Sequence, residues 1–324
     1  MNDVLLEVTG LRVRFNAAME AVRGVSLTVR TGETHCLVGE SGCGKSVTAL
    51  AVMGLLARGA VREARQLRFG GADLAALGER GMAGLRGDRM AMIFQEPMTS
   101  LNPAYTVGSQ MAEVYTRHRG GGRRAALLRA AALLGRVGIT APAMRLAQYP
   151  HQLSGGLRQR VMIAMALMCE PALLIADEPT TALDVTVQAQ ILRLLLELQR
   201  EMGLAILLIT HDIGIVARMA HQVSVMYAGE VVECAPAAAL FAAPTHPYTR
   251  GLLASVPIPG TVARGSPLGS IPGSVPRIPV GFRGCGFRDR CSEAVAGCAD
   301  AVPLRETGTD HRTLCRLEAG WVTA

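Results

Sequence analysis

Apolar and polar residues alternate along the first part of the chain. Over residues 5–15, and again over residues 25–29, β-branched and apolar side chains alternate with polar ones. This period of two is typical of strands that face a core on one side. The apolar segment 34–39 predicts a third strand, and the glycine-rich sequence after it leads into a helix expected to begin at Lys45.

A helical pattern covers the middle of the chain. Residues 106–148 are rich in alanine, leucine and arginine at helical spacing. One helix is predicted over residues 123–138, because Gly138 suits a helix C-cap. We therefore expect a small helical subdomain at about residues 96–160.

A strand, a helix and a second strand follow this subdomain. Residues 171–177 form a continuous apolar run, which is typical of a buried parallel strand. Residues 186–202 predict a helix closed by Gly203, and residues 204–210 predict the next strand. A βαβ pattern indicates a parallel sheet, so the sequence predicts an α/β fold.

Composition favours a folded protein. Half of the 324 residues are apolar, which is enough for a sizeable core in one or two domains. A net charge of +7 with 18% charged residues falls short of the basic stripe of a nucleic-acid binder, so no nucleic acid is expected as a partner. No secretory signal opens the chain, and its apolar runs are far below the roughly 20 residues of a membrane helix. We expect a cytosolic chain that reaches a membrane only through a partner.

A phosphate-binding motif joins the third strand to the helix at Lys45. Residues 39–46, GESGCGKS, fit G-x-x-x-x-G-K-[ST] between a predicted strand and a predicted helix, which makes a chance glycine-rich turn a weak alternative. Backbone N–H groups favour a bound anion, Lys45 reaches the β- and γ-phosphates, and Ser46 offers its hydroxyl to Mg²⁺. The expected ATP-binding residues here are Gly39, Glu40, Ser41, Gly42, Cys43, Gly44, Lys45, Ser46 and Val47.

Two adjacent carboxylates end the apolar strand at residues 171–177. A P-loop protein needs a carboxylate at the end of a second strand to hold its metal, and Asp177 is placed to reach the Mg²⁺ shell. Glu178, the next residue, can accept a proton from the attacking water as a general base. Without the phosphate-binding motif, a solvated acidic pair would be the better interpretation.

The segment LSGGLRQR at residues 153–160 resembles the signature sequence of ABC ATPases. Ser154, Gly155 and Gly156 open a predicted helix, so a hydroxyl, N–H groups and the helix dipole all suit a γ-phosphate. In that family the phosphate is bound to the P-loop of the opposite subunit. The resemblance implies a P-loop NTPase core with an antiparallel β subdomain and a helical subdomain.

The resemblance extends to four single residues, each of which would otherwise be read as structural. Gln95 resembles the glutamine that contacts Mg²⁺ and the attacking water, and Asp184 resembles the aspartate that communicates across the dimer. His211 resembles the histidine that touches the γ-phosphate, and Phe15 is placed to stack on adenine. The resemblance thus implies an active ATPase whose catalytic residues are Lys45, Gln95, Glu178 and His211, with Mg²⁺ held by Ser46, Gln95 and Asp177.

Further motifs resemble one branch of this family. MTSLNP, YPHQLSGG and above all HPYTRGLL at residues 246–253 are similar to the ATP-binding subunits of dipeptide and oligopeptide permeases. The resemblance implies two membrane permeases, a second ATPase subunit and an extracytoplasmic solute-binding protein, with this chain at the cytoplasmic face of the inner membrane. Importers of nickel or another small solute stay open as an alternative. Soluble ABC ATPases of translation or DNA repair are a remote one, because this chain has one P-loop and no heptad run.

Composition changes at residue 256. Proline and glycine supply 11 of the 26 residues at positions 256–281, too many for a helix or a central strand. We interpret this segment as a linker or a draped extended segment. The expected domains are an ABC ATPase domain at residues 1–243 and a permease-type C-terminal extension at residues 244–324.

The extension carries four cysteines, with the spacing C-x5-C-x6-C-x16-C: Cys285, Cys291, Cys298 and Cys315. Disulfides are disfavoured in the reducing cytosol, and the spacing is not that of a zinc ribbon. Because some ATPases of peptide permeases hold a [4Fe-4S] cluster at a similar pattern, the resemblance implies such a cluster, ahead of Zn²⁺. Four free thiols are the alternative. Cys36, Cys169 and Cys234 are expected to be packing residues.

Overall fold

The computed structural model describes residues 3–16, 19–95, 100–181, 183–256 and 269–317. The chain forms two units, each built from several segments. The helical unit comprises Met1–Leu5, Arg30–Gly32 and Ala76–Leu208, and the P-loop unit comprises Leu6–Val29, Glu33–Ala75 and Ile209–Ala324. The domain boundary expected between residues 243 and 244 stays a prediction.

An antiparallel sheet lies in the P-loop unit, as predicted. Its order is β2-β1-β5-β6, and β4 also pairs with β1. The strands are β1 (Val4–Asn16), β2 (Met19–Arg30), β4 (Val61–Glu63), β5 (Gln66–Phe69) and β6 (Ala72–Asp73). Along β1 the buried positions change parity, from Leu6 and Val8 to Leu11 and Val13. Gly10 between them has φ 64, a conformation that glycine adopts without strain and that redirects the strand.

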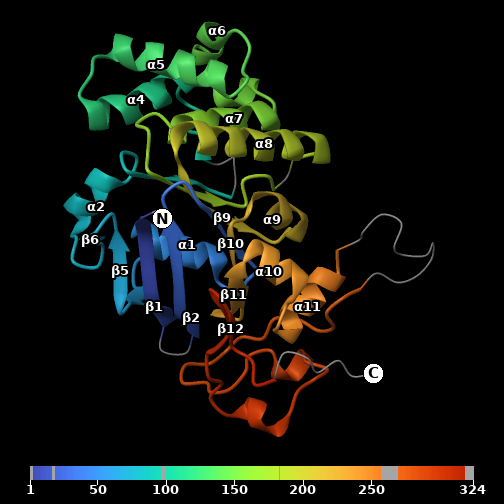
Figure 1. Ribbon diagram of the computed structural model, residues 1–324. Coiled ribbons are helices and arrows are strands. Elements are labelled where there is room, and N and C mark those ends of the chain that lie inside the picture. Colours follow the sequence, from blue (N-terminus) through green and yellow to red (C-terminus); the bar gives the residue numbers. More distant parts are fainter. Residues whose placement is uncertain (1–2, 17–18, 96–99, 182, 257–268, 318–324) are drawn as a thin grey trace. The chain divides into compact units, whose positions relative to one another are not determined.

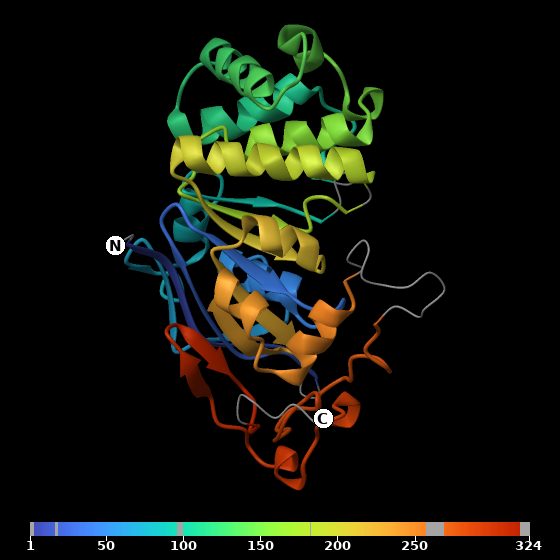
Figure 2. The same cartoon turned by 45° about the vertical axis from the view of Figure 1, so that its right-hand side comes forward.

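A second sheet in the P-loop unit carries the predicted strand at residues 34–39. Here β3 (Thr34–Val38) pairs in parallel with β10 (Gln222–Tyr227), and β10 pairs in antiparallel with β11 (Glu230–Pro236). The C-terminal strands β12 (Arg305–Gly308) and β13 (His311–Thr313) continue this sheet, because β13 pairs with β11. They are the red arrows of Figure 2. Strands β12 and β13 are therefore part of the sheet that contains β3.

The helices of the P-loop unit are short. They are α1 (Lys45–Met53), α9 (Ile213–Met219), α10 (Ala237–Ala242), α11 (Pro247–Ala254) and the 3-10 turns η2 (Arg288–Arg290) and η3 (Ala296–Ala299). Part of the predicted linker, residues 257–268, lies outside the described residues. Its described remainder, residues 269–281, contains no helix, and Pro279 makes an isolated bridge with Met19.

The helical unit confirms both the helical subdomain and the βαβ pattern. Strand β8 (Leu173–Asp177) pairs in parallel with β7 (Met90–Ile93) and neighbours β9 (Ala205–Thr210) on its other side. The helices are α2 (Glu79–Leu85), α4 (Val107–Arg119), α5 (Arg123–Arg136), α6 (Pro142–Leu146), the turn η1 (Pro150–Gln152), α7 (Gly155–Ala166) and α8 (Val185–Met202). Figure 1 shows α4, α5 and α6 in green, with α7 beside the long helix α8. The first residues expected in this subdomain, 96–99, lie outside the described residues.

Helix ends follow the local signals of the sequence. Helix α1 begins at Lys45, and α8 ends before Gly203, whose φ of 63 suits a C-cap. Helix α5 ends at Arg136, two residues before Gly138, which has φ 77. Together the elements confirm the α/β fold class with its antiparallel and helical subdomains. Within the described ranges, no helix is both long and apolar enough to cross a membrane.

Candidate nucleotide-binding site

The phosphate-binding motif forms the turn between β3 and α1. A Cβ atom at Gly39 would lie 2.1 Å from the carbonyl oxygen of Met226, and one at Gly44 would lie 2.5 Å from that of Ala21. Gly44 also has φ 106, which other residues rarely adopt. Both glycines are thus required by the close approach of neighbouring strands. The strand, turn and helix that the motif needs are all present.

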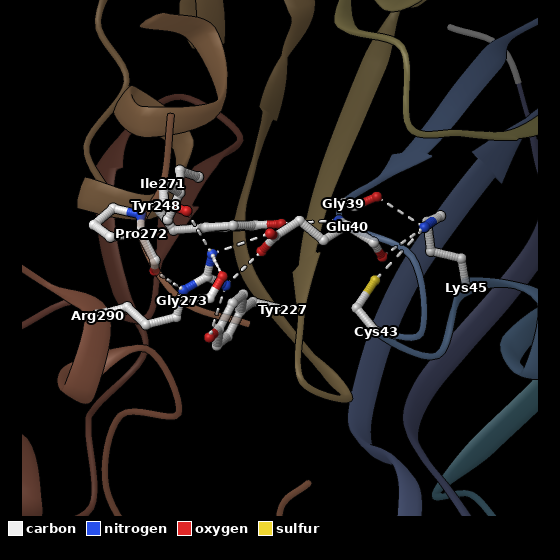
Figure 3. Close-up of polar contacts among 10 residues, drawn as sticks. All are labelled: Gly39, Glu40, Cys43, Lys45, Tyr227, Tyr248, Ile271, Pro272, Gly273 and Arg290. Atoms are coloured by element: carbon white, nitrogen blue, oxygen red, sulfur yellow. Dashed lines mark hydrogen bonds and ion pairs between the residues drawn. The ribbon is translucent and has the colours of Figure 1, made fainter. Parts of the chain in front are cut away.

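The amino group of Lys45 lies inside this turn. Its side chain is buried, and Nζ donates hydrogen bonds to the carbonyl oxygens of Gly39 at 2.8 Å and Glu40 at 2.9 Å (Figure 3). Burial raises the pKa of the Cys43 thiol, and the charge of Lys45 offsets this only in part. The turn therefore presents a fixed positive charge and the N-terminus of α1 beside a neutral thiol, which favours an anion.

Lys45 is also the only lysine in the sequence, which otherwise relies on arginine for positive charge. Glu40, Ser46 and Val47 are half-buried, whereas Ser41 and Gly42 are exposed. Elsewhere in the P-loop unit, Phe15 is half-buried near the end of β1, and His211 is exposed directly after β9.

The helical unit brings two of the predicted catalytic residues together. Asp177 ends β8 and is buried, and Glu178 follows with φ 46. The amide of Gln95 donates a hydrogen bond to Oε2 of Glu178 at 3.0 Å, and the hydroxyl of Thr181 donates one to the same oxygen at 2.9 Å. Sequence reasoning missed Thr181, because no motif distinguishes it from the threonine before it. The carboxylate is thus oriented from two sides.

Ser154 and Asp184 cap the helices that follow them. The side chain of Ser154 accepts a hydrogen bond from the backbone N–H of Leu157 at the start of α7, and Asp184 accepts one from Val187 at the start of α8. Ser154, Gly155 and Asp184 are exposed, so the N-terminus of α7 is open to an anion from outside the unit. At Gly156, a Cβ atom would lie only 3.0 Å from Val187, so this glycine lets α7 pack closely against α8.

Two side chains that sequence reasoning did not single out touch the phosphate loop. The hydroxyl of Tyr248 on α11 accepts a hydrogen bond from the backbone N–H of Glu40 at 2.9 Å. Arg290 at the end of η2 forms an ion pair with the carboxylate of Glu40 at 2.7 Å (Figure 3). Neither residue belongs to a phosphate-binding motif, so the sequence carries no local signal for these contacts.

The four cysteines of the extension line one small cavity. Cys298 and Cys315 are buried and Cys285 and Cys291 are half-buried, and all four border the cavity. Burial and the neighbouring thiols raise the pKa of Cys285 to about 11, so this thiol is protonated at neutral pH. Among the described residues, no group of three or more histidine, cysteine, aspartate or glutamate side chains is placed to hold a metal. As arranged, the thiols share a cavity without forming a coordination site.

All eight cysteines lie in the described part of the chain, and none forms a disulfide. The expected packing residues Cys36, Cys169 and Cys234 are buried, which confirms that prediction.

Two family models match the chain. The model described as ABC transporter matches residues 22–181, which include the phosphate-binding motif, the signature sequence and both carboxylates. The model described as oligopeptide/dipeptide transporter, C-terminal region, matches residues 232–298, which include Tyr248 and Arg290.

Relatives from several bacteria are similar to this chain over almost their whole length. A putative peptide import ATP-binding protein of Brucella melitensis is 50% identical over 325 residues, which cover 96% of this chain and 96% of the relative. The dipeptide transport ATP-binding protein DppD of Escherichia coli is 50% identical, with 95% and 94% covered. DppD of Bacillus subtilis is 47% identical, with 98% and 95% covered.

Solved structures share the fold. The structure of cbiO1 from Clostridium perfringens, part of an ABC transporter complex, has a TM-score of 0.64 and 28% identity, covering 74% of this chain and 91% of that one. The dimeric structure of MJ0796, a bacterial ABC transporter cassette, has a TM-score of 0.63 and 25% identity, covering 72% and 99%. The chain therefore belongs to the ABC transporter family, as an ATP-hydrolysing subunit with the oligopeptide/dipeptide transporter C-terminal region.

Proposed function

We propose that this chain energises the uptake of dipeptides or oligopeptides through a membrane importer. The observation that carries the proposal is the match of residues 232–298 to the C-terminal region of oligopeptide and dipeptide transporters. Relatives of nearly equal length are named as peptide import or dipeptide transport ATP-binding proteins, which supports the same substrate class. The proposed partners are two permeases, a second and distinct ATPase subunit, and an extracytoplasmic solute-binding protein. The proposed location is the cytoplasmic face of the inner membrane.

The proposed ATP cycle uses residues of both units. Lys45 and the N-terminus of α1 would bind the phosphates of ATP, and Phe15 would stack on its adenine. Ser154 of the second ATPase subunit would contact the γ-phosphate, so that ATP favours the closed dimer.

The Ser46 hydroxyl, the Gln95 amide and the Asp177 carboxylate offer the oxygen ligands that Mg²⁺ prefers, and Mg²⁺ would neutralise phosphate charge. Glu178 would accept the proton of the attacking water. Asp184 would communicate across the dimer, and His211 would contact the γ-phosphate.

The Lys45→Ala variant is expected to lose peptide uptake while still assembling with its permeases. Removing the one buried ammonium of the turn removes the charge that binds phosphate, so ATP affinity should fall by about 100-fold or more. Uptake of a labelled dipeptide into vesicles that contain the complex measures this directly. If vesicles that contain the unmodified chain take up nickel but no peptide, the small-solute alternative is supported instead.

A labelling experiment isolates the nucleotide site from transport. Because Lys45 is the only lysine, an amine-directed reagent can modify only this side chain and the N-terminus of the chain. ATP is expected to protect Lys45 from modification, as read by mass spectrometry of the peptide that contains it. Equal labelling with and without saturating ATP would contradict the proposed role of Lys45.

A metal centre in the extension is a further part of this proposal. Thiolates suit zinc and iron–sulfur clusters, and the four cysteines border one cavity. The cavity has a volume of about 10 Å³, room for about one water, so a [4Fe-4S] cluster would require the thiols to move outward. Burial raises the pKa of Cys285, Cys291 and Cys315, so binding would also have to displace protons from these three thiols.

Metal analysis of anaerobically purified protein tests this centre. We expect iron with absorbance near 400 nm or, second, zinc, and loss of the metal in Cys291→Ser. Cys234→Ser is the matched control, because Cys234 is a free thiol of the same unit that does not border this cavity. Protein that contains neither iron nor zinc would leave four reduced thiols as the correct interpretation.

A further inference from the structure

Arg290 links the C-terminal extension to the phosphate loop through a two-point ion pair. Its Nη1 donates to Oε2 of Glu40 at 2.7 Å, and its Nη2 donates to Oε1 at 3.1 Å (Figure 3). Glu40 is the second residue of the motif GESGCGKS, and Arg290 lies 250 positions further along the chain. Both residues belong to the P-loop unit. The pair is bidentate, which is the strongest and most directional form of an arginine–carboxylate contact.

The guanidinium of Arg290 is held in place by other contacts as well. Its side chain is 7% exposed. Nε donates to the carbonyl oxygen of Pro272 at 2.6 Å, and Nη2 also reaches the carbonyl oxygen of Ile271 at 3.1 Å. Nη1 lies 3.3 Å from the hydroxyl of Tyr227. The charge is therefore fixed before any ligand arrives, and it is aimed at Glu40.

Tyr248 fixes the backbone at the same position. Its hydroxyl accepts the N–H of Glu40 at 2.9 Å, and its fully buried ring packs edge-on against Tyr227, with 4.7 Å between the ring centroids. Burial raises the pKa of Tyr248, so the phenol stays neutral. Side chain and backbone of Glu40 are thus both held by residues from the C-terminal part of the chain.

The contacts that Arg290 and Tyr248 make with Glu40 form a network that also affects the position of Lys45. The ammonium of Lys45 hydrogen-bonds the carbonyl oxygen of Glu40, so the position of that peptide decides where the ammonium can rest. The carboxylate of Glu40 would repel a triphosphate if it stood unpaired, because like charges in a partly buried site are weakly screened. An arginine paired with it cancels that repulsion and keeps the peptide in place.

We infer that Arg290 is a positioning residue of the nucleotide site, which sets ATP affinity by neutralising Glu40 and holding the phosphate loop. The inference rests on the proposed role of Lys45 in ATP binding. By this inference, the C-terminal extension contributes to the binding of ATP at the nucleotide site. The proposed base, Glu178, belongs to the helical unit, whereas Arg290 and Glu40 belong to the P-loop unit, so we expect Arg290 to affect binding of ATP more than its hydrolysis.

Steady-state kinetics of the assembled ATPase test the inference. Arg290→Ala is expected to raise the KM for ATP about tenfold while kcat changes less than about twofold. Arg290→Lys restores the charge without the two-point geometry and should give an intermediate KM. Arg288→Ala is the matched control, since Arg288 lies on the same turn but pairs with Asp289 at the surface. Its KM should equal that of the unmodified chain.

Repeating the Arg290→Ala change in a Glu40→Gln chain separates the effect of the lost charge from an effect on folding. In the Glu40→Gln chain there is no carboxylate to neutralise, so adding Arg290→Ala should raise KM by less than about twofold. An unchanged KM in Arg290→Ala overturns the inference, as does an equal loss of kcat and thermal stability in Arg290→Ala and Arg288→Ala. If Lys45→Ala keeps its ATP affinity, the proposed nucleotide site is wrong and not merely the role of Arg290.

Proteolysis gives a readout that does not depend on turnover. A lysine-specific protease can cut this chain only after Lys45, which is buried. Loosening the loop by Arg290→Ala should speed that single cleavage about tenfold in the absence of nucleotide. Equal cleavage rates for Arg290→Ala, Arg288→Ala and the unmodified chain would count against a role in holding the loop.

Discussion

Replacing Glu178 with glutamine is expected to lower ATP turnover by about 10² to 10⁴-fold, the usual contribution of a general base. Glutamine keeps the size of the side chain but cannot accept a proton. The hydrogen bond from Thr181 to Oε2 can persist, so the geometry of the turn after β8 should survive. ATP affinity should stay near that of the unmodified chain, because Lys45 is unaffected. Hydrolysis rates and equilibrium binding of ATP measure the two effects separately.

Glu170→Gln is the matched control for this change. Glu170 lies in the same unit, also has a positive φ, of 54, and pairs with Arg129 at the surface. Its replacement should leave turnover unchanged, because exposed ion pairs contribute little. Near-normal hydrolysis by the Glu178→Gln variant would falsify the assignment of Glu178 as the base.

Removal of the Glu233 carboxylate is expected to lower the free energy of unfolding by about 3–5 kcal/mol, because several buried hydrogen-bond donors are left without an acceptor, at about 1–3 kcal/mol each. Glu233 on β11 is fully buried and pairs with His311 of β13 at 2.7 Å. It also accepts hydrogen bonds from the backbone N–H groups of Thr245 at 2.7 Å and His246 at 2.9 Å. In Glu233→Ala these donors lose their acceptor, and the contacts that join α11 and β13 to β11 are lost with it. Denaturant titration measures the change.

The pH dependence of stability gives an independent test of Glu233. Burial alone would raise the pKa of this carboxyl, but the hydrogen bonds donated to it outweigh burial and hold the pKa below its usual value of 4.5. The unfolded chain therefore binds this proton more readily than the folded one. The stabilisation is complete above pH 4.5 and is lost as the pH falls through the lowered pKa of the folded state.

Two outcomes would argue against this role of Glu233. Glu306→Ala is the control, because Glu306 on β12 is exposed, and it should change stability by less than about 0.5 kcal/mol. A Glu233→Ala chain as stable as that control would show that the contacts seen around Glu233 contribute nothing. An unchanged acid profile in the Glu233→Ala chain would show that another carboxyl governs the acid transition.

Local signals in the sequence were sufficient for much of the fold and of the site. The start of α1 at Lys45 and the end of α8 before Gly203 were predicted, because glycine acts on the backbone next to it. The sequence assigned Gln95 and Glu178 to one site, but their direct contact was not predicted, since 83 positions separate the two residues. Thr181 was not predicted, because its role depends on the turn that Glu178 makes after β8.

Contacts between distant segments were beyond such reasoning. The sequence predicted a C-terminal extension, but it predicted neither the pairing of β13 with β11 nor the contact of Arg290 with Glu40. Periodicity predicts that a segment forms a strand, but its partner strand is set by packing. The sequence does not indicate which carboxylate a given arginine will contact in the folded chain.

The ion pair between Glu40 and Arg290 has a consequence for biosynthesis. At about 5–20 residues per second, a ribosome needs on the order of 12–50 s to add the 250 residues between them. During that interval the ion pair between Glu40 and Arg290 cannot form, because Arg290 has not yet been added to the chain. A chain that stops before Arg290 can never form this ion pair. If Arg290 sets ATP affinity as inferred, full-length chains should therefore bind ATP more tightly than chains that stop before this residue.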